Sequence, residues 1–103
     1  MITSKNKVID LGDVVRGSTI SHTFELKNEY SKPIYVTKAV ASCGCTKPFI
    51  QVGFIKPQDS VSLQFMFNTQ GKGLGDTVKS ITLHYTINNE PSTFVQKFKA
   101  KLV

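Results

Sequence analysis

Val61-Ser62-Leu63-Gln64-Phe65-Met66-Phe67 places an aliphatic or phenylalanine side chain at every second position. This alternation is typical of a β-strand with one buried face, because successive side chains of a strand point to opposite sides of the sheet. The same alternation returns at residues 20–26, 81–87 and 94–102, and no segment keeps the spacing of an amphipathic helix. The sequence therefore predicts an all-β chain.

Turn-forming residues separate the predicted strands. They include Gly12-Asp13, residues 28–33 and 55–59, the glycine-rich segment 71–76, and Asn88-Asn89-Glu90-Pro91, which predicts a hairpin. A turn roughly every 8 to 12 residues is typical of a β-sandwich, and we predict an immunoglobulin-like β-sandwich of about seven strands. With 103 residues the chain has the size of one domain, so we expect a single domain over 1–103, with residues 1–7 as a flexible arm before a first strand near Val8–Leu11.

One position conflicts with strict alternation. In residues 34–40 the pattern turns Lys38 inward, between Val36 and Val40. A β-bulge or a strand end at this point would turn the lysine outward again.

Composition and charge narrow the classes of function. Thirteen Lys and Arg residues against seven Asp and Glu give a net charge of +6, which favours encounters with acidic surfaces. No apolar run approaches the roughly 18 residues of a membrane helix, so we expect no membrane span. The segment Met1–Lys7 lacks the apolar stretch of a secretory signal. A cytoplasmic or virion location is therefore favoured. A cell-envelope location applies if a leader has been trimmed.

Both cysteines lie in Ser42-Cys43-Gly44-Cys45-Thr46, directly after an apolar strand-like run. In one extended strand the two side chains would lie about 6.5 to 7 Å apart, at the limit of disulfide geometry, so a bridge requires a tight turn at Gly44. We favour a loop-shaping role. A redox pair and a metal site with Cys43 and Cys45 as ligands remain alternatives, although a closed zinc site takes about four ligands.

Lys97, Lys99 and Lys101 share the outer face of the last predicted strand, and we assign Lys79 to the same stripe. The stripe is interpreted either as a surface for an acidic partner or, preferably, as protection of a sheet edge against unwanted pairing. No exposed aromatic set accompanies the lysines, as it does in proteins that stack single-stranded nucleic acid. Nucleic acid is therefore not the expected partner.

Enzyme signatures are missing from the sequence. His22 and His84 fall on opposite faces of different predicted strands, and no nucleophile elbow, carboxylate pair or His-Glu-x-x-His motif accompanies them. The segment Gly71–Gly75 lacks the strand-then-helix context of a phosphate-binding loop, so we interpret it as a flexible connection. We expect no enzyme, no cofactor and no small-molecule substrate.

The order of several motifs resembles a known family. These motifs are Ile9–Val14, Gly17, Phe24–Asn28, Lys32-Pro33-Ile34, Ser42–Thr46 and Ile55-Lys56-Pro57. The chain from about Val8 to Val103 resembles a bacterial immunoglobulin-like domain family of unknown function, which is similar to the Hydin and major-sperm-protein sandwiches. Ser42–Thr46 is the most specific part of this resemblance, and Pro57-Gln58 stands where members usually carry Pro-Gly. The resemblance implies a non-enzymatic role, in many members behind an export leader.

These observations predict a structural or interaction module that docks on a larger protein assembly. A leaderless basic sandwich resembles the small proteins that decorate phage capsids, so virion decoration with a capsid protein as partner is the most concrete version. The first alternative is an exported binding domain of the cell envelope. The second is a thiol redox or metal-handling protein that acts through Cys43 and Cys45.

Overall fold

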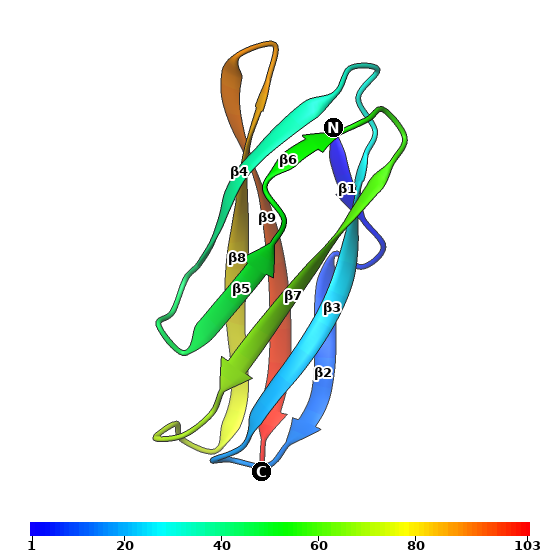
Figure 1. Ribbon diagram of the computed structural model, residues 1–103. Coiled ribbons are helices and arrows are strands. Elements are labelled where there is room, and N and C mark those ends of the chain that lie inside the picture. Colours follow the sequence, from blue (N-terminus) through cyan, green and yellow to red (C-terminus); the bar gives the residue numbers. More distant parts are fainter.

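Nine strands and no helix make up the computed structural model, which describes residues 1–103. The strands are β1 (Ile2–Ser4), β2 (Val8–Val14), β3 (Thr19–Asn28), β4 (Ile34–Ala41), β5 (Thr46–Ile50), β6 (Gly53–Ile55), β7 (Ser60–Asn68), β8 (Gly75–Ile87) and β9 (Glu90–Leu102). They form one sheet in the order β1-β3-β7-β5 and a second in the order β2-β9-β8-β4-β6, and the two sheets face each other (Figure 1). The predicted all-β sandwich is confirmed. The strand number is higher than predicted because β1 and β6, with three residues each, are too short to show an alternation.

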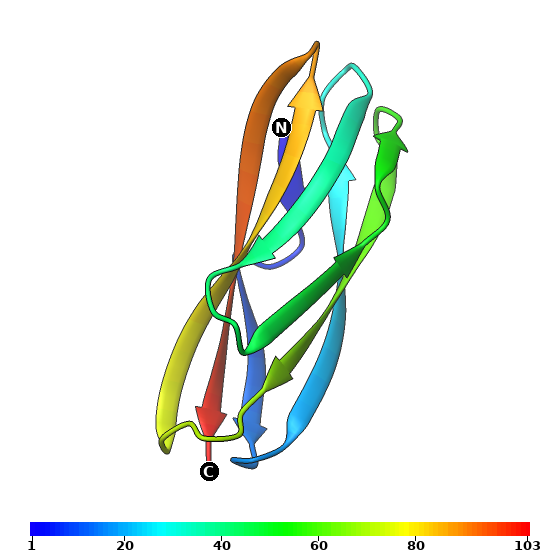
Figure 2. The ribbon, with the colours of Figure 1, turned by 60° about the vertical axis from the view of Figure 1, so that its left-hand side comes forward.

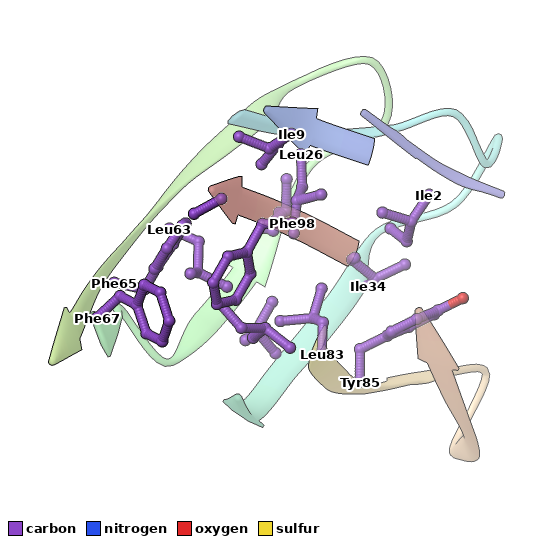
Figure 3. Packing of buried hydrophobic residues seen from close by; sticks show 14 of the residues in the cluster. Ile2, Ile9, Leu26, Ile34, Leu63, Phe65, Phe67, Leu83, Tyr85 and Phe98 are labelled. Atoms are coloured by element: carbon purple, nitrogen blue, oxygen red, sulfur yellow. The ribbon is translucent and has the colours of Figure 1, made fainter. Parts of the chain in front are cut away.

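The core is shared by both sheets. Phe98 of β9 packs against Phe65 and Phe67 of β7, with ring centroids 4.6 and 5.4 Å apart (Figure 3). All three side chains are buried, as the alternation of β7 and β9 predicts. Burial of each such side chain contributes about 1.5–3 kcal/mol, so the sandwich needs no distant cross-link.

The expected flexible arm is wrong, because residues 1–7 are anchored. Strand β1 pairs antiparallel with the end of β3, and Ile2 is 6% exposed. The buried side chain of Gln96 donates to the carbonyls of Asn6 (3.0 Å) and Lys7 (3.2 Å) and accepts from the Ser4 hydroxyl (2.5 Å). A single apolar residue among polar ones shows no periodicity, so the sequence pattern could not reveal this strand.

Gly12-Asp13 was expected to be a turn, and the structure instead continues β2 to Val14. The pairing of β2 with β9 shifts register between Asp10 and Asp13, and Gly12 has a φ of 71°. This is a bulge within a strand, a place where glycine accepts a positive φ without the strain of a side chain.

Two other local expectations hold. The pairing of β4 with β8 shifts register between Val36 and Lys38, and Lys38 is exposed opposite His84, so the bulge predicted there exists. Strands β8 and β9 form a hairpin whose two-residue turn, Asn88-Asn89, has φ values of 52° and 63°.

No helix long and apolar enough to cross a membrane occurs in the structure.

Candidate functional site

The Ser42–Thr46 tip is the corner where the chain passes from one sheet to the other. It joins β4 of the five-stranded sheet to β5 of the four-stranded sheet (Figure 2). On one side Ser42 N donates to Ser80 O (2.9 Å) and Ser80 N donates to Ser42 Oγ (3.0 Å). On the other side Asn68 N donates to Cys45 O (2.8 Å). The tip is therefore bonded to both layers.

Cys43 and Cys45 are joined by a disulfide. Their Cα atoms are 5.2 Å apart, within the usual range for a bridge. The approach depends on a tight turn at Gly44, closed by a hydrogen bond from Thr46 N to Cys43 O (3.1 Å), as the sequence required. No group of three His, Cys, Asp or Glu side chains converges to hold a metal ion.

The two sulfur atoms have different surroundings. Cys43 Sγ accepts from Cys45 N (3.1 Å) and from Lys72 Nζ (3.6 Å). Cys45 packs against the core, and its Sγ has one hydrogen-bond partner, the Thr46 hydroxyl at 3.7 Å. Lys72 is not among the site residues predicted from the sequence, because the glycine-rich segment around it is typical of a connection. Its contact with Cys43 joins residues 29 positions apart, and no local pattern signals it.

The surface around the lysine stripe carries charges of both signs. Lys97, Lys99 and Lys101 are exposed on the outer face of β9, as predicted. Aspartates flank them, however: Asp10 and Asp13 of β2 pair with Lys99 and Lys101, Asp76 of β8 also pairs with Lys101, and Lys99 Nζ lies 3.8 Å from Asp10 Oδ2. Exposed pairs of this kind are worth about 0–1 kcal/mol, so they matter more for the local potential than for stability.

The assignment of Lys79 to this stripe is wrong. Lys79 of β8 pairs directly with Phe98, whose side chain lies in the core, so Lys79 points to the inner side of its sheet and is half-buried. Its parity with Ile81, two residues on, gives the same result, because residues i and i+2 of a strand share a face.

The two histidines do not meet. His22 lies on β3 and packs against Phe65, with ring centroids 5.7 Å apart, whereas His84 lies on the outer face of β8 in the other sheet. Neither has a cysteine or a carboxylate as a hydrogen-bond partner, so the structure assembles no catalytic pair around them.

A free backbone edge lies beside the tip. Strand β8 pairs with β9 along its whole length, but β4 pairs only with residues 81–86 of β8, and Figure 1 shows β4 leaving β8 halfway. Because Ser80 bonds to Ser42, its backbone groups point to the β4 side. Backbone groups of alternate residues point the same way, so those of Val78 and Asp76 also point to this side, where no strand receives them.

Most other edges carry features that discourage pairing with another chain. Strands β1 and β6 are three residues long, β5 contains Pro48, β2 is interrupted by its bulge, and the free part of β9 contains Pro91. Residues 19–25 of β3 are also unpaired on one side, but that stretch exposes no large apolar side chain. Val78, by contrast, is 59% exposed and Leu74 67% exposed.

Several solved structures have the same fold although their sequences differ strongly from this one. The PapD-like domain 7 of human CEP192 matches with a TM-score of 0.70 and 13% identity over 99% of this chain and 84% of that one. The MSP-domain protein SSP-19 of Caenorhabditis elegans matches with a TM-score of 0.67 and 16% identity, over 96% of this chain and 98% of that one. The Escherichia coli chaperone DraB matches with a TM-score of 0.69 and 12% identity, over 99% of this chain and 55% of that one.

Some matching proteins are much longer. The Vibrio cholerae protease VesB matches with a TM-score of 0.75 and 11% identity over 97% of this chain, which spans 31% of the protease. These likenesses define an immunoglobulin-like sandwich of the PapD and MSP type. The chain belongs to the family described as protein of unknown function (DUF1573), which matches residues 2–102. Among curated protein sequences no relative matches.

Proposed function

We propose that this domain is a protein-interaction module that binds an extended segment of a partner protein as an additional strand along residues 75–79 of β8. The observation that carries the proposal is the unpaired backbone edge at Asp76 and Val78. Main-chain hydrogen bonds give such a complex its affinity, and side chains on alternate positions give it specificity.

The side chains along this edge indicate the chemistry of the segment. The exposed Val78 offers an apolar contact on the outer face. The half-buried Lys79 lies on the inner face, and Lys72 lies at the adjoining corner. An extended segment with an apolar residue beside Val78 and an acidic residue toward Lys79 complements these groups, in keeping with the net charge of +6.

The fold supports a binding role without naming the partner. DraB, which shares the fold, is named as a chaperone. Docking onto a capsid as a virion decoration protein is the most concrete version of the proposal, and docking onto a cell-envelope protein is the alternative. The identity of the captured partner separates the two versions.

Site-specific photo-cross-linking tests the surface. A photoreactive phenylalanine analogue replaces Val78 in the producing cells, and a matched variant carries it at Ser62, which is exposed on the outer face of the other sheet. We expect a discrete adduct from position 78 that maps to an extended, acidic segment of one protein. Equal adducts from both positions, or an adduct at 62 alone, would contradict strand addition at β8.

A second variant separates the backbone from the side chain. Val78→Pro removes the N–H that points to the free edge and leaves the bonds to β9 in place, a position where proline is tolerated in sheets. Val78→Thr keeps that N–H and the preference for a strand. Once the cross-linked segment is known as a peptide, we expect Val78→Pro to weaken its binding at least tenfold and Val78→Thr to weaken it much less. Circular dichroism confirms that both variants are folded.

A further inference from the structure

The Cys43–Cys45 bridge is poorly placed to stabilise the fold. The two residues are separated by two positions in the sequence, so the bridge closes a very short loop. A disulfide restricts the unfolded chain less when the loop is short. The core already joins the two sheets through Phe65, Phe67 and Phe98. Stabilisation of the fold alone therefore does not account for the bridge.

We propose that Cys43 and Cys45 form a thiol–disulfide exchange site in which Lys72 and the Cys45 N–H hold Cys43 as the thiolate, and whose substrates are thiols and disulfides of other molecules. The two donors on Cys43 Sγ, at 3.1 and 3.6 Å, carry the assignment. A cation and an N–H donor beside a sulfur favour its thiolate form. The only hydrogen-bond partner of Cys45 Sγ is a hydroxyl, at 3.7 Å, and the residue packs against the apolar core, which does not favour a thiolate.

The asymmetry fixes the direction of each step. A substrate thiolate attacks Cys45 Sγ, a bond forms between the two sulfurs, and the Cys43–Cys45 bond breaks. Its electron pair passes to Cys43 Sγ, which leaves as the thiolate beside Lys72, and the better-stabilised thiolate is the better leaving group. A second substrate thiol then attacks the substrate sulfur of the mixed disulfide. It releases Cys45, which takes up a proton, so the protein gains two electrons and the substrate becomes a disulfide.

Positive charges outnumber negative ones around the corner. The segments that bond to the tip bring Lys72 from the connection after β7 and Lys79 next to Ser80 on β8. Asp76 is the acidic residue of these segments, on the outer face of β8. Cys43 is half-buried between the exposed Ser42 and Gly44. Cys45 is half-buried between Gly44 and the buried Thr46 and packs against the core, so a second molecule reaches the tip from the Gly44 side.

Alkylation kinetics test which sulfur is the thiolate. The protein is reduced and treated with iodoacetamide at about pH 7, where an ordinary cysteine is mostly protonated, and the labelled residue is located by fragmentation mass spectrometry. We expect Cys43 to react about tenfold faster than Cys45, and Lys72→Gln to slow Cys43 about tenfold. Lys47→Gln, on a neighbouring exposed lysine, is the matched control and should leave most of the rate unchanged. Equal labelling of both cysteines, or no effect of Lys72→Gln, would overturn the assignment.

Exchange itself is tested with two probes, reduced glutathione as a small thiol and reduced thioredoxin as a protein dithiol. Reduction of the bridge by either probe supports exchange, and the faster probe identifies the class of substrate. A bridge that resists both overturns the proposal. Cys43→Ser should retain a mixed disulfide at Cys45 after treatment with oxidised glutathione, whereas the reduced wild type resolves it to the internal bridge. Val78→Pro should leave these rates unchanged, so exchange and strand addition fail separately.

Discussion

The Cys43–Cys45 bridge is expected to contribute little to the free energy of unfolding, because the core already holds the two sheets together. Closing a loop of this length restricts the unfolded chain by about 1.5 kcal/mol in the chain-entropy account. We expect the Cys43→Ser, Cys45→Ser double variant to lose about that much free energy of unfolding in guanidinium titrations. Reduced wild type should match the double variant. A loss above about 4 kcal/mol, typical of bridges over long loops, would show that the corner holds the sandwich together.

Tyr30 and Tyr85 form a hydrogen bond at the far end of the core, with their hydroxyl oxygens 2.9 Å apart. This hydrogen bond, followed by burial, raises the pKa of Tyr30 above its usual 10.0. A raised pKa in the folded state means that folding favours the neutral phenol. The resulting stability is therefore present below about pH 10 and is lost as the pH rises through the raised pKa.

The Tyr30→Phe variant tests that contribution. At about pH 7 we expect it to lose about 1 kcal/mol of unfolding free energy, because the buried Tyr85 hydroxyl loses its partner. Above about pH 10 the wild type should lose stability more steeply than the variant, so their urea midpoints should converge. Midpoints that stay a constant distance apart through the alkaline range would contradict the coupling.

At the scale of elements, the β8–β9 hairpin turns on two residues that both have positive φ, 52° at Asn88 and 63° at Asn89. Such a turn prefers glycine at its second position, and asparagine tolerates the conformation better than other residues with a side chain. We expect Asn89→Gly to raise the free energy of unfolding by about 0.5 kcal/mol and Asn89→Ala to lower it by about 1 kcal/mol. Thermal unfolding by circular dichroism measures both, and an alanine variant as stable as the wild type would contradict the turn geometry.

The strands differ in how far the sequence could predict them. Strands β7, β8 and β9 are long enough for alternation to fix both their existence and their buried faces, as the core positions of Phe65 and Phe98 show. Strand β1 escaped prediction because three residues carry no period. The side of Lys79 was available from its parity with Ile81, and the correction required only that rule. The contact of Lys72 with Cys43 depends on how a glycine-rich connection folds back, which local rules cannot supply.

At the scale of the whole molecule, the core that stabilises the fold is separate from the surfaces that we propose for binding. The outer faces carry polar and charged side chains together with exposed apolar ones such as Phe54 and Val78, and carboxylates at Asp10, Asp13 and Asp76 divide the basic surface of β9. The two surfaces that we propose for contact with other molecules are the backbone of β8 where β4 leaves it and the disulfide at the adjoining corner. Both lie on the same margin because one event, the crossing of the chain from β4 to β5, creates the free edge and positions the tip.

Phe98 belongs to the core that the two sheets share. It projects from the five-stranded sheet onto Phe65 and Phe67 of the other, and it is 1% exposed. Removal of a buried phenylalanine ring costs about 3–5 kcal/mol, a large part of the roughly 5–15 kcal/mol that holds a domain folded. We expect Phe98→Ala to shift the unfolding of both layers by the same amount. Far-ultraviolet circular dichroism reports on all strands and tyrosine fluorescence reports on the Tyr30–Tyr85 end, so their guanidinium transitions should coincide in wild type and variant alike. If the tyrosine signal kept its original midpoint while the strand signal moved, the two ends of the sandwich would be separate units, and a single shared core would no longer describe the molecule.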